Sequence, residues 1–160
     1  MPEIIHAQDT DWPRVREIRL RALSADPYAF GQSWETESAY PDSVWQERVA
    51  ESAWFLALEE GDPIGVVTTR HEADSPEEER ELQAMWVQAD FRKSGVAREL
   101  ADSVFEWAAN DGASVVTLYV SPSNPAVKMY EALGFTDTGD RWTVSEDDPK
   151  SAWIKMARPL

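Results

Sequence analysis

Residues 90–100, "DFRKSGVAREL", join a strand pattern to a helix pattern through a single glycine, and the neighbouring elements follow from them. Before this stretch, "ELQAMWV" (81–87) predicts a strand. After Gly95, apolar residues recur at three- and four-residue spacings and predict a helix that ends at "NDG" (110–112). The helical positions are Val96, Ala97, Leu100, Ala101, Val104, Phe105, Trp107 and Ala108. A helix that starts at such a turn presents unpaired N–H groups, which favour an anion.

The same stretch concentrates positive charge in an acidic chain. Arg92, Lys93 and Arg98 lie around Gly95, whereas the whole chain has 30 acidic and 15 basic residues and a net charge of -15. Gly95 lets the backbone approach a ligand closely, and Ala97 keeps the first turn of the helix uncrowded. The pattern predicts a diphosphate site; the alternative is an ordinary helix start with solvated basic residues. A P-loop and a dinucleotide fingerprint are both excluded by the glycine spacing.

Composition indicates one folded domain over residues 1–160. The chain is 42% hydrophobic with eight tryptophans, and it has no apolar run long enough to span a membrane. The N-terminus lacks a signal-peptide pattern, so we expect a cytoplasmic protein without a membrane partner. No cysteine is present and no ligand cluster surrounds His6 or His71, so no metal is expected. The acidic excess argues against nucleic-acid binding; it indicates either attraction of cationic partners or simple solubility or salt adaptation.

The remaining pattern predicts an α/β domain with one mixed sheet in the order βααβββαβαββ. Strands are expected over residues 3–7, 54–58, 64–70 and 81–87, then 114–120, buried on both faces, and around 136–144 and 152–157. The last two are joined by the polar segment 145–150. Further helices are expected within 9–26, 41–52 and 121–135.

Local signals refine these helices. The first is expected to begin at Thr10 or Asp11. The second is expected to be capped by Ser43, with Gln46 in the capping-box position. In the last helix, Asn124 fits the cap, and Pro125 and Gly134 fit the first turn and the end. The buried face of the first helix is expected to carry Val15, Ile18, Ala22 and Leu23.

Three motifs in order resemble one family. "RKSGVA" (92–97) fits the Arg/Gln-x-x-Gly-x-Gly/Ala signature of the GCN5-related N-acetyltransferase (GNAT) superfamily. The segment 81–91 resembles that family's fourth strand, and "NPAVKMYEALGF" (124–135) is similar to its element with an asparagine, a tyrosine and a Gly-Phe pair. The chain departs from many members at Lys93 and Ser94, where they carry glycine and a basic residue. The resemblance implies a mostly antiparallel sheet with splayed central strands, flanked by helices.

The resemblance also implies the reaction and the donor. Members bind acetyl-coenzyme A (acetyl-CoA) and pass the acetyl group directly to an acceptor, here a small amine, an amino-sugar-like compound or a peptide amine. The strand residues Met85 and Val87 would pair with the pantetheine arm, and an amide near Met85 would face the thioester oxygen. The pyrophosphate would lie on the amides of Gly95, Val96, Ala97 and Arg98, near Arg92, Lys93 and Ser94. Asn124 would contact the donor or only cap its helix.

Two proton movements are needed for transfer to an amine. Tyr130 matches the family's tyrosine, whose phenol donates to the departing sulfur, although its position also fits a packing role. Glu81 lies where some relatives carry the general base; alternatively, it only ends a solvated acidic run. Less favoured bases are Glu35, Glu37 and Asp74.

The resemblance implies that the acceptor site is lined by the connection between the first two helices (26–40) and by the last hairpin (138–148). Tyr28, Phe30, Trp34 and Trp142 would form an aromatic wall suited to a cationic amine; the alternative is that they are core residues. A non-catalytic acyl-CoA-binding or regulatory module is the alternative function. The resemblance is compatible with a homodimer, for which the sequence shows no interface.

Overall fold

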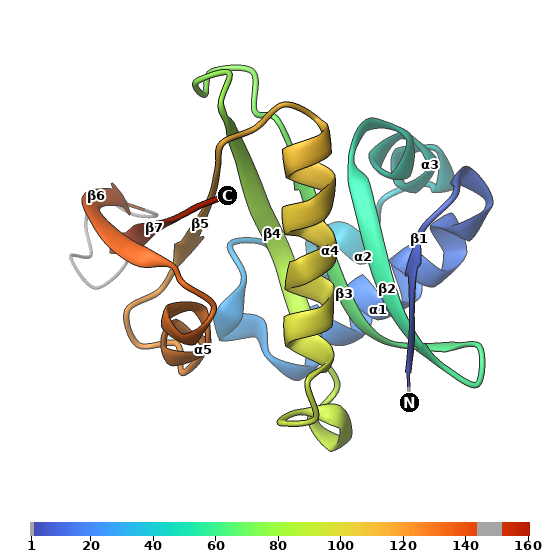
Figure 1. Ribbon diagram of the computed structural model, residues 1–160. Coiled ribbons are helices and arrows are strands. Elements are labelled where there is room, and N and C mark those ends of the chain that lie inside the picture. Colours follow the sequence, from blue (N-terminus) through green and yellow to red (C-terminus); the bar gives the residue numbers. More distant parts are fainter. Residues whose placement is uncertain (1, 144–151) are drawn as a thin grey trace.

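The computed structural model describes residues 2–143 and 152–160, and its centre is a mixed sheet of seven strands (Figure 1). The strand order is β1-β2-β3-β4-β5-β7-β6, and only β4 and β5 are parallel neighbours. This arrangement confirms the expected mixed, mostly antiparallel sheet. The strands are β1 (Glu3–His6), β2 (Ala53–Glu59), β3 (Asp62–Arg70), β4 (Glu79–Val87), β5 (Val115–Val120), β6 (Thr136–Thr143) and β7 (Ala152–Pro159).

Helices cover both faces of the sheet, with α4 in front of it and α1 to α3 behind it in Figure 1. They are α1 (Trp12–Ala25), α2 (Trp34–Ser38), α3 (Asp42–Glu51), α4 (Val96–Asn110) and α5 (Ala126–Ala132). The four apolar residues expected on the buried face of α1 are all buried. Burial of these apolar stripes against the sheet holds the two layers of helices in place.

Some local expectations are corrected. The short helix α2 was absent from the expected order, because its sequence "WETES" has no apolar period. Its start is capped by Ser33, which accepts a hydrogen bond from the Thr36 amide. Ser43 does not cap α3, because that helix starts at Asp42 and Pro41 occupies the cap position, so Gln46 is not in the capping-box position either. Pro125 occupies the cap position of α5, and the side-chain oxygen of Asn124, one residue earlier, accepts a 2.9 Å hydrogen bond from the Ala126 amide.

A glycine lets α4 approach the sheet closely. A Cβ atom at Gly65 on β3 would lie 3.2 Å from Leu100 of α4 and 3.3 Å from Ala57 of β2. Both distances are tighter than ordinary side-chain contacts, so a larger residue would push α4 away from β3. Gly65 thereby fixes the height of α4 above the sheet, and the start of α4 is part of the site described below.

Strands β4 and β5 pair over only three residues and then diverge. Glu79, Arg80 and Glu81 face Val115 to Thr117, and the pairing stops there although both strands continue. Arg80 is buried at this point, and its guanidinium donates to the Asp111 carboxylate and to main-chain carbonyls. The pairing is thus anchored at one end and open at the other, which confirms the splayed central strands.

A β-bulge lies in the open part of β4. The register with β3 shifts by one residue between Val66 and Thr68, and Ala84 on β4 has a φ of 60°. Bulges re-aim the backbone and often lie beside active sites. On the other side of the opening, Tyr119 of β5 is exposed, so the expectation that β5 is buried on both faces is wrong. It is wrong because β4 has moved away from this end of β5.

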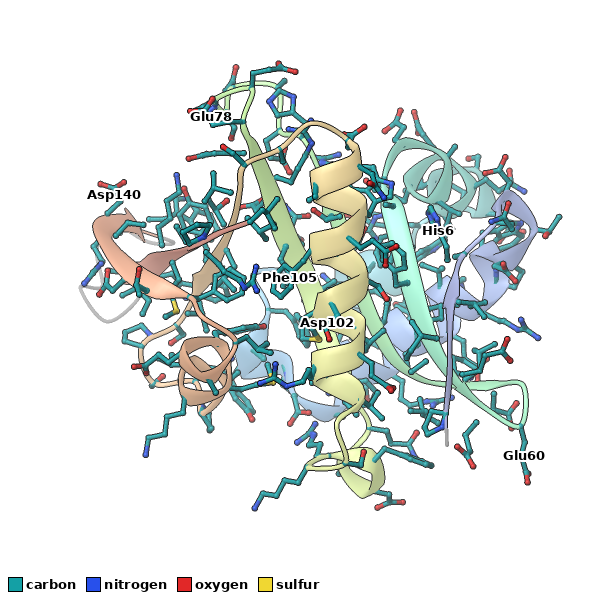
Figure 2. All side chains as sticks on the ribbon, viewed as in Figure 1. His6, Glu60, Glu78, Asp102, Phe105 and Asp140 are labelled. Carbon is teal, nitrogen blue, oxygen red and sulfur yellow. The ribbon has the colours of Figure 1, made fainter. Side chains whose placement is uncertain are left out.

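The acidic charge is spread over the surface. Glu60, Glu78 and Asp140 project outward from the edges of the molecule in Figure 2, and each is exposed. In the described ranges, no helix combines the length and the apolar character needed to cross a membrane. The expected connection over 145–150 lies outside the described residues.

Candidate functional site

The opening between β4 and β5 is part of a cleft of about 1310 Å³. The start of α4, the helix α5 and the segment 28–32 also line it. Of the residues expected in a site, the lining contains Tyr28, Phe30, Glu81, Met85, Val87, Arg92, Lys93, Gly95, Ala97, Arg98, Asn124, Tyr130 and Trp142. Side chains from distant parts of the sequence therefore meet where the sheet splits.

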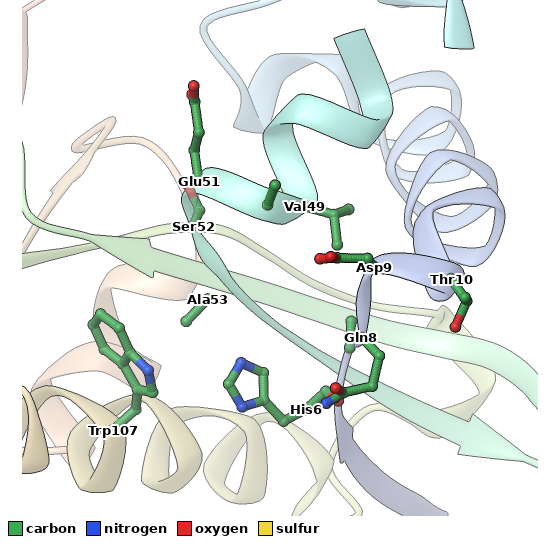
Figure 3. Close-up of a pocket in the computed structure, with 11 residues that line it drawn as sticks. His6, Gln8, Asp9, Thr10, Val49, Glu51, Ser52, Ala53 and Trp107 are labelled. Carbon is green, nitrogen blue, oxygen red and sulfur yellow. The ribbon is translucent and has the colours of Figure 1, made fainter. Parts of the chain in front are cut away.

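Of the residues expected to bind the donor or the acceptor, three do not line this cleft: Trp34, Ser94 and Val96. Val96 is buried in the core, and the hydroxyl of Ser94 donates to the Phe91 carbonyl. A separate, shallower hollow of about 500 Å³ lies beside His6 and Trp107 and contains none of the expected residues (Figure 3).

Unpaired amides at the start of α4 form one end of the cleft. Gly95 occupies the cap position with a φ of 92°, and Lys93 has a φ of 61°. The first main-chain bond of the helix runs from the Glu99 amide to the Gly95 carbonyl. Among the described residues, no acceptor is recorded for the amides of Val96, Ala97 and Arg98. Open space surrounds the position of a Gly95 Cβ, so this end of the helix fits an anion such as a diphosphate.

Arg92 ties this end of the cleft to the C-terminus of α1. Its guanidinium donates to the Val87 carbonyl and to the Asp26 carboxylate, each at 2.7 Å. Trp86 donates to the same Asp26 oxygen at 2.7 Å. Burial would raise the pKa of Asp26, but the hydrogen bonds from Trp86 and Arg92 outweigh it and hold that pKa below its usual value. Part of the positive charge that the sequence places here is therefore structural.

Tyr130 reaches the cleft from the hydrophobic core. It is only 7% exposed, and its ring meets Phe135 edge-on at 5.8 Å. Burial raises the pKa of Tyr130 well above its usual value, so the phenol keeps its proton at any physiological pH. Tyr130 therefore both packs against Phe135 in the core and lines the cleft.

Glu81 lies in a cluster of polar side chains on the edge of the cleft. Gln83 donates to both Glu81 and Glu72, and Glu72 is held by two hydrogen bonds from Arg70, at 2.8 and 3.0 Å. Burial raises the pKa of Glu81, whereas the Arg70 bonds lower that of Glu72. Two carboxyl groups with opposite shifts are typical of an acid–base site. The sequence did not point to Glu72, which lies in the loop after β3.

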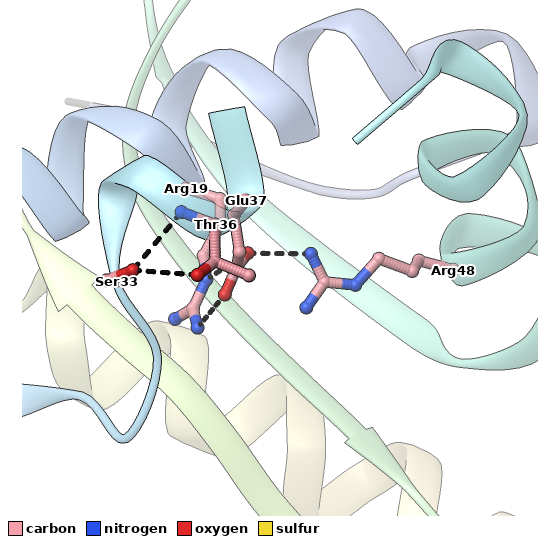
Figure 4. Close-up of polar contacts among 5 residues, drawn as sticks. All are labelled: Arg19, Ser33, Thr36, Glu37 and Arg48. Atoms are coloured by element: carbon pink, nitrogen blue, oxygen red, sulfur yellow. Dashed lines mark hydrogen bonds and ion pairs between the residues drawn. The ribbon is translucent and has the colours of Figure 1, made fainter. Parts of the chain in front are cut away.

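Glu37 is not available as a base. It is completely buried and accepts hydrogen bonds from Arg19 and Arg48 (Figure 4). Burial would raise the pKa of Glu37, but these two guanidinium groups outweigh it and lower the pKa. The expected stand-in role of Glu37 therefore has no geometric basis. Glu35 is exposed and lies outside the cleft lining, whereas Asp74 lines it.

Exposed aromatic residues gather at the other end of the cleft. Tyr28 is 61% exposed and Trp142 is 47% exposed, so these two are not core residues. Trp142 meets Tyr119 and Trp153 edge-on, at 6.0 and 5.8 Å. Trp34 is also exposed but lies outside the lining. The aromatic cluster at this end therefore includes Tyr119 of β5 and Trp153 of β7, two residues that the sequence analysis did not name.

Comparison with known proteins identifies relatives. Residues 12–135 match the model of the acetyltransferase (GNAT) family. Human N-acetylaspartate synthetase is 36% identical over 90 residues, which are 55% of this chain and 29% of that protein. Aminoglycoside N(6')-acetyltransferase type 1 of Salmonella typhimurium is 32% identical over 92 residues, 54% of this chain and 63% of that protein. The chain spans less than two thirds of the length of these relatives.

Solved structures show the same fold. An acetyltransferase of the GNAT family from Streptococcus pneumoniae superposes with a TM-score of 0.82 at 16% identity, covering 100% of this chain and 99% of that chain. A putative acetyltransferase from Salmonella typhimurium, solved with its cofactor acetyl-CoA, has a TM-score of 0.78 at 17% identity, covering 100% and 94%.

Replacement of Asp26 by Asn tests the link between α1 and the cleft. The folded-state pKa of Asp26 is below its unfolded value, so its stabilisation is present above the usual aspartate pKa and lost as the pH falls through the folded-state pKa. We expect Asp26→Asn to lower the free energy of unfolding by about 1–3 kcal/mol at pH 7, and the difference to shrink in acid. Urea unfolding at several pH values measures it. The exposed Asp137→Asn, which also breaks a pair with an arginine, should change little; equal losses in both variants would refute the role.

Proposed function

The chain belongs to the acetyltransferase (GNAT) family, and from that premise we propose that it is an acetyl-CoA-dependent N-acetyltransferase. The observation that carries the proposal is the cleft, which runs from the unpaired amides of α4 through the opening between β4 and β5 to the polar cluster around Glu81. The fold shared with an acetyltransferase solved with its cofactor acetyl-CoA supports the donor. The donor supplies an activated acetyl thioester; every other contribution comes from this chain.

Main-chain groups of α4 and β4 bind the donor in this proposal. The amides of Val96, Ala97 and Arg98, with Lys93 beside them, bind the diphosphate. The free edge of β4 at Met85 and Val87 offers main-chain groups to the pantetheine arm. The bulge at Ala84 changes the course of the β4 backbone beside the opening, and in this proposal an amide near Met85 stabilises negative charge on the thioester oxygen.

Glu81 removes a proton from the acceptor amine, directly or through water. Its pKa is raised by burial, which brings it nearer to the working pH of a base. Tyr130 donates a hydrogen bond to the departing sulfur. Its raised pKa makes complete transfer of the proton to a thiolate unfavourable, because an ordinary thiol has a pKa of about 8.5. Stabilisation of the thiolate by hydrogen bonding is therefore the contribution that Tyr130 makes.

An acceptor screen tests the proposal. The full chain is incubated with acetyl-CoA and a panel of amines, and thiol release is followed. The panel includes aspartate and an aminoglycoside, after the relatives' names, together with small amines and peptides. We expect release that depends on at least one amine. CoA binding by calorimetry without release from any acceptor would instead support a non-catalytic acyl-CoA-binding module.

Two glycines at opposite ends of α4 give a matched test of the diphosphate site. Gly95 and Gly112 have φ values of 92° and 91°, and a Cβ at either position meets nothing within 4 Å. Gly95→Asp places a negative charge against the diphosphate, so we expect CoA affinity to fall about 100-fold or more. Gly112→Asp imposes similar backbone strain and should leave the affinity nearly unchanged. Calorimetry measures both, and equal affinities would remove the diphosphate from this end of α4.

Tyr130→Phe deletes only the hydroxyl group and keeps the packing against Phe135. We expect kcat to fall by about 10- to 100-fold, the range for one charge-assisted hydrogen bond, with little change in CoA affinity. Tyr119→Phe removes a hydroxyl from another tyrosine of the cleft lining and is the control. Steady-state kinetics and calorimetry provide the two readouts; an unaltered kcat in Tyr130→Phe would leave that residue with a packing role alone.

Glu81→Gln tests the base. The wild-type rate should fall in acid as Glu81 becomes protonated, at a higher pH than for an ordinary glutamate, because its pKa is raised. The variant should lose about 100-fold near neutral pH and recover at high pH, where the amine deprotonates in solution. Glu79→Gln, on the same strand but paired with Lys155, is the control. A pH–rate profile for Glu81→Gln that keeps the wild-type acid limb would assign the base elsewhere.

A further inference from the structure

Arg19 and Arg48, which line the cleft, both contact the buried carboxylate of Glu37 (Figure 4). Arg19 donates from Nε and Nη2 to the two oxygens of Glu37, at 3.1 and 2.9 Å, and Arg48 donates from Nη1 at 2.8 Å. Within residues 2–143 and 152–160, no other carboxylate lies at ion-pair distance from either arginine. Two positive charges thus face one negative charge, and one positive charge is in excess.

This excess charge is held largely away from water. Glu37 is fully buried, and the side chains of Arg19 and Arg48 are only 8% and 30% exposed. Burial of a charge is costly unless an opposite charge compensates it. The ring faces of Phe30 and Trp45, each 4.8 Å from a guanidinium carbon, compensate it only in part. A chain of net charge -15 nevertheless keeps an unmatched positive charge at this place.

None of the carboxylates that line the cleft pairs with Arg19 or Arg48 in the described residues. Glu72 is bonded to Arg70, and the charges of Glu81 and Glu51 also act on Arg70, whose pKa is raised mainly by its bond to Glu72. These carboxylates therefore compensate the charge of Arg70 rather than the charges of Arg19 and Arg48. Glu51 is the nearest of them to Arg48 in sequence, yet the two form no ion pair in the described structure.

The register of the sheet places Arg48 and Glu81 on different sides of the cleft. Trp54 of β2 donates to the Arg48 carbonyl at 3.0 Å and lies opposite Thr68 of β3, which lies opposite Gln83 of β4. Arg48 is therefore on the β2 side and Glu81 is on the β4 side. The main chains of β2 and β4 are two strand spacings apart, about 10 Å.

We propose that the acceptor is an amine that also carries a carboxylate, and that Arg48 and Arg19 bind this carboxylate while the amine lies near Glu81. The inference rests on the proposed function of the same cleft. The guanidinium N–H groups that Glu37 does not use donate to the carboxylate, and its charge compensates the excess. Because the two arginines and Glu81 lie on different sides of the cleft, acceptors whose amine and carboxylate are several bonds apart are favoured. Such acceptors are ω-amino acids, the ε-amine of lysine and short peptides.

Equilibrium binding tests the proposal without relying on turnover. The full chain, saturated with CoA, is titrated by calorimetry with acids and their amides. The acids are glycine, β-alanine, γ-aminobutyrate, ε-aminocaproate, lysine and dialanine. We expect at least one of the longer acids to bind about tenfold or more tightly than its amide, the range for one charged hydrogen bond. If no acid is favoured over its amide, the proposal is wrong.

Variants assign the preference to the arginines. Arg48→Gln should abolish the preference for the acid while leaving CoA affinity unchanged, and Arg48→Lys should retain part of it, because lysine keeps the charge but not the planar donor group. Arg14→Gln, at a half-exposed arginine whose one ion-pair partner among the described residues is Asp11, is the matched control. If Arg48→Gln does not fold, Arg48→Lys decides; a full acid preference in the folded Arg48 variants would overturn the proposal.

Thiol release with the same pairs separates this inference from the proposed function. Acids that bind through Arg48 but are never acetylated would count against the N-acetyltransferase and leave the carboxylate site standing. Acids and amides that are acetylated and bound equally well would overturn the carboxylate site and leave the N-acetyltransferase standing.

Discussion

The loss of pairing between β4 and β5 after three residues is the constraint on which the site depends. Both strands keep their other neighbours, so the sheet stays continuous while a slot opens through its centre. The buried Arg80 holds the paired end together, and the bulge at Ala84 turns the β4 backbone on the open side. Because α4 follows β4 after a short turn, its unpaired amides lie at the mouth of the slot. The donor site that we propose is therefore mainly a main-chain structure.

Side-chain charges divide the cleft into regions. Arg92 is bound to Asp26 and fixes the α1 end, so in our account Lys93 and the α4 amides remain for a diphosphate. Glu81, whose pKa is raised by burial, lies in the region where an amine would lose its proton. The buried Glu37 with its two arginines holds the short helix α2 against α1 and α3 and leaves one positive charge in excess. Although the net charge of the protein is negative, the local charge therefore differs from one region of the cleft to the next.

The sequence predicts the parts of this fold that local patterns control. Apolar periods identified α1, α4 and the central strands, and the glycine turn at Gly95 located the start of α4. Helix α2 was missed because a five-residue polar segment depends on the tertiary ion pairs of Glu37 rather than on a period. Glu72 and Trp153 were missed because their places in the cleft depend on the loop after β3 and on the register of β7, which a single sequence does not encode locally. Glu37 was misjudged as a possible base because exposure and burial of a carboxylate cannot be distinguished without its partners.

A crystal structure of the protein with bound CoA tests the central claim most directly. The account predicts that the pantetheine arm lies between β4 and β5 beyond Glu81 and Thr117, with the diphosphate within hydrogen-bond distance of the Val96 to Arg98 amides. CoA found elsewhere, for example in the hollow beside His6, or a slot between β4 and β5 filled by side chains in the complex, would contradict it.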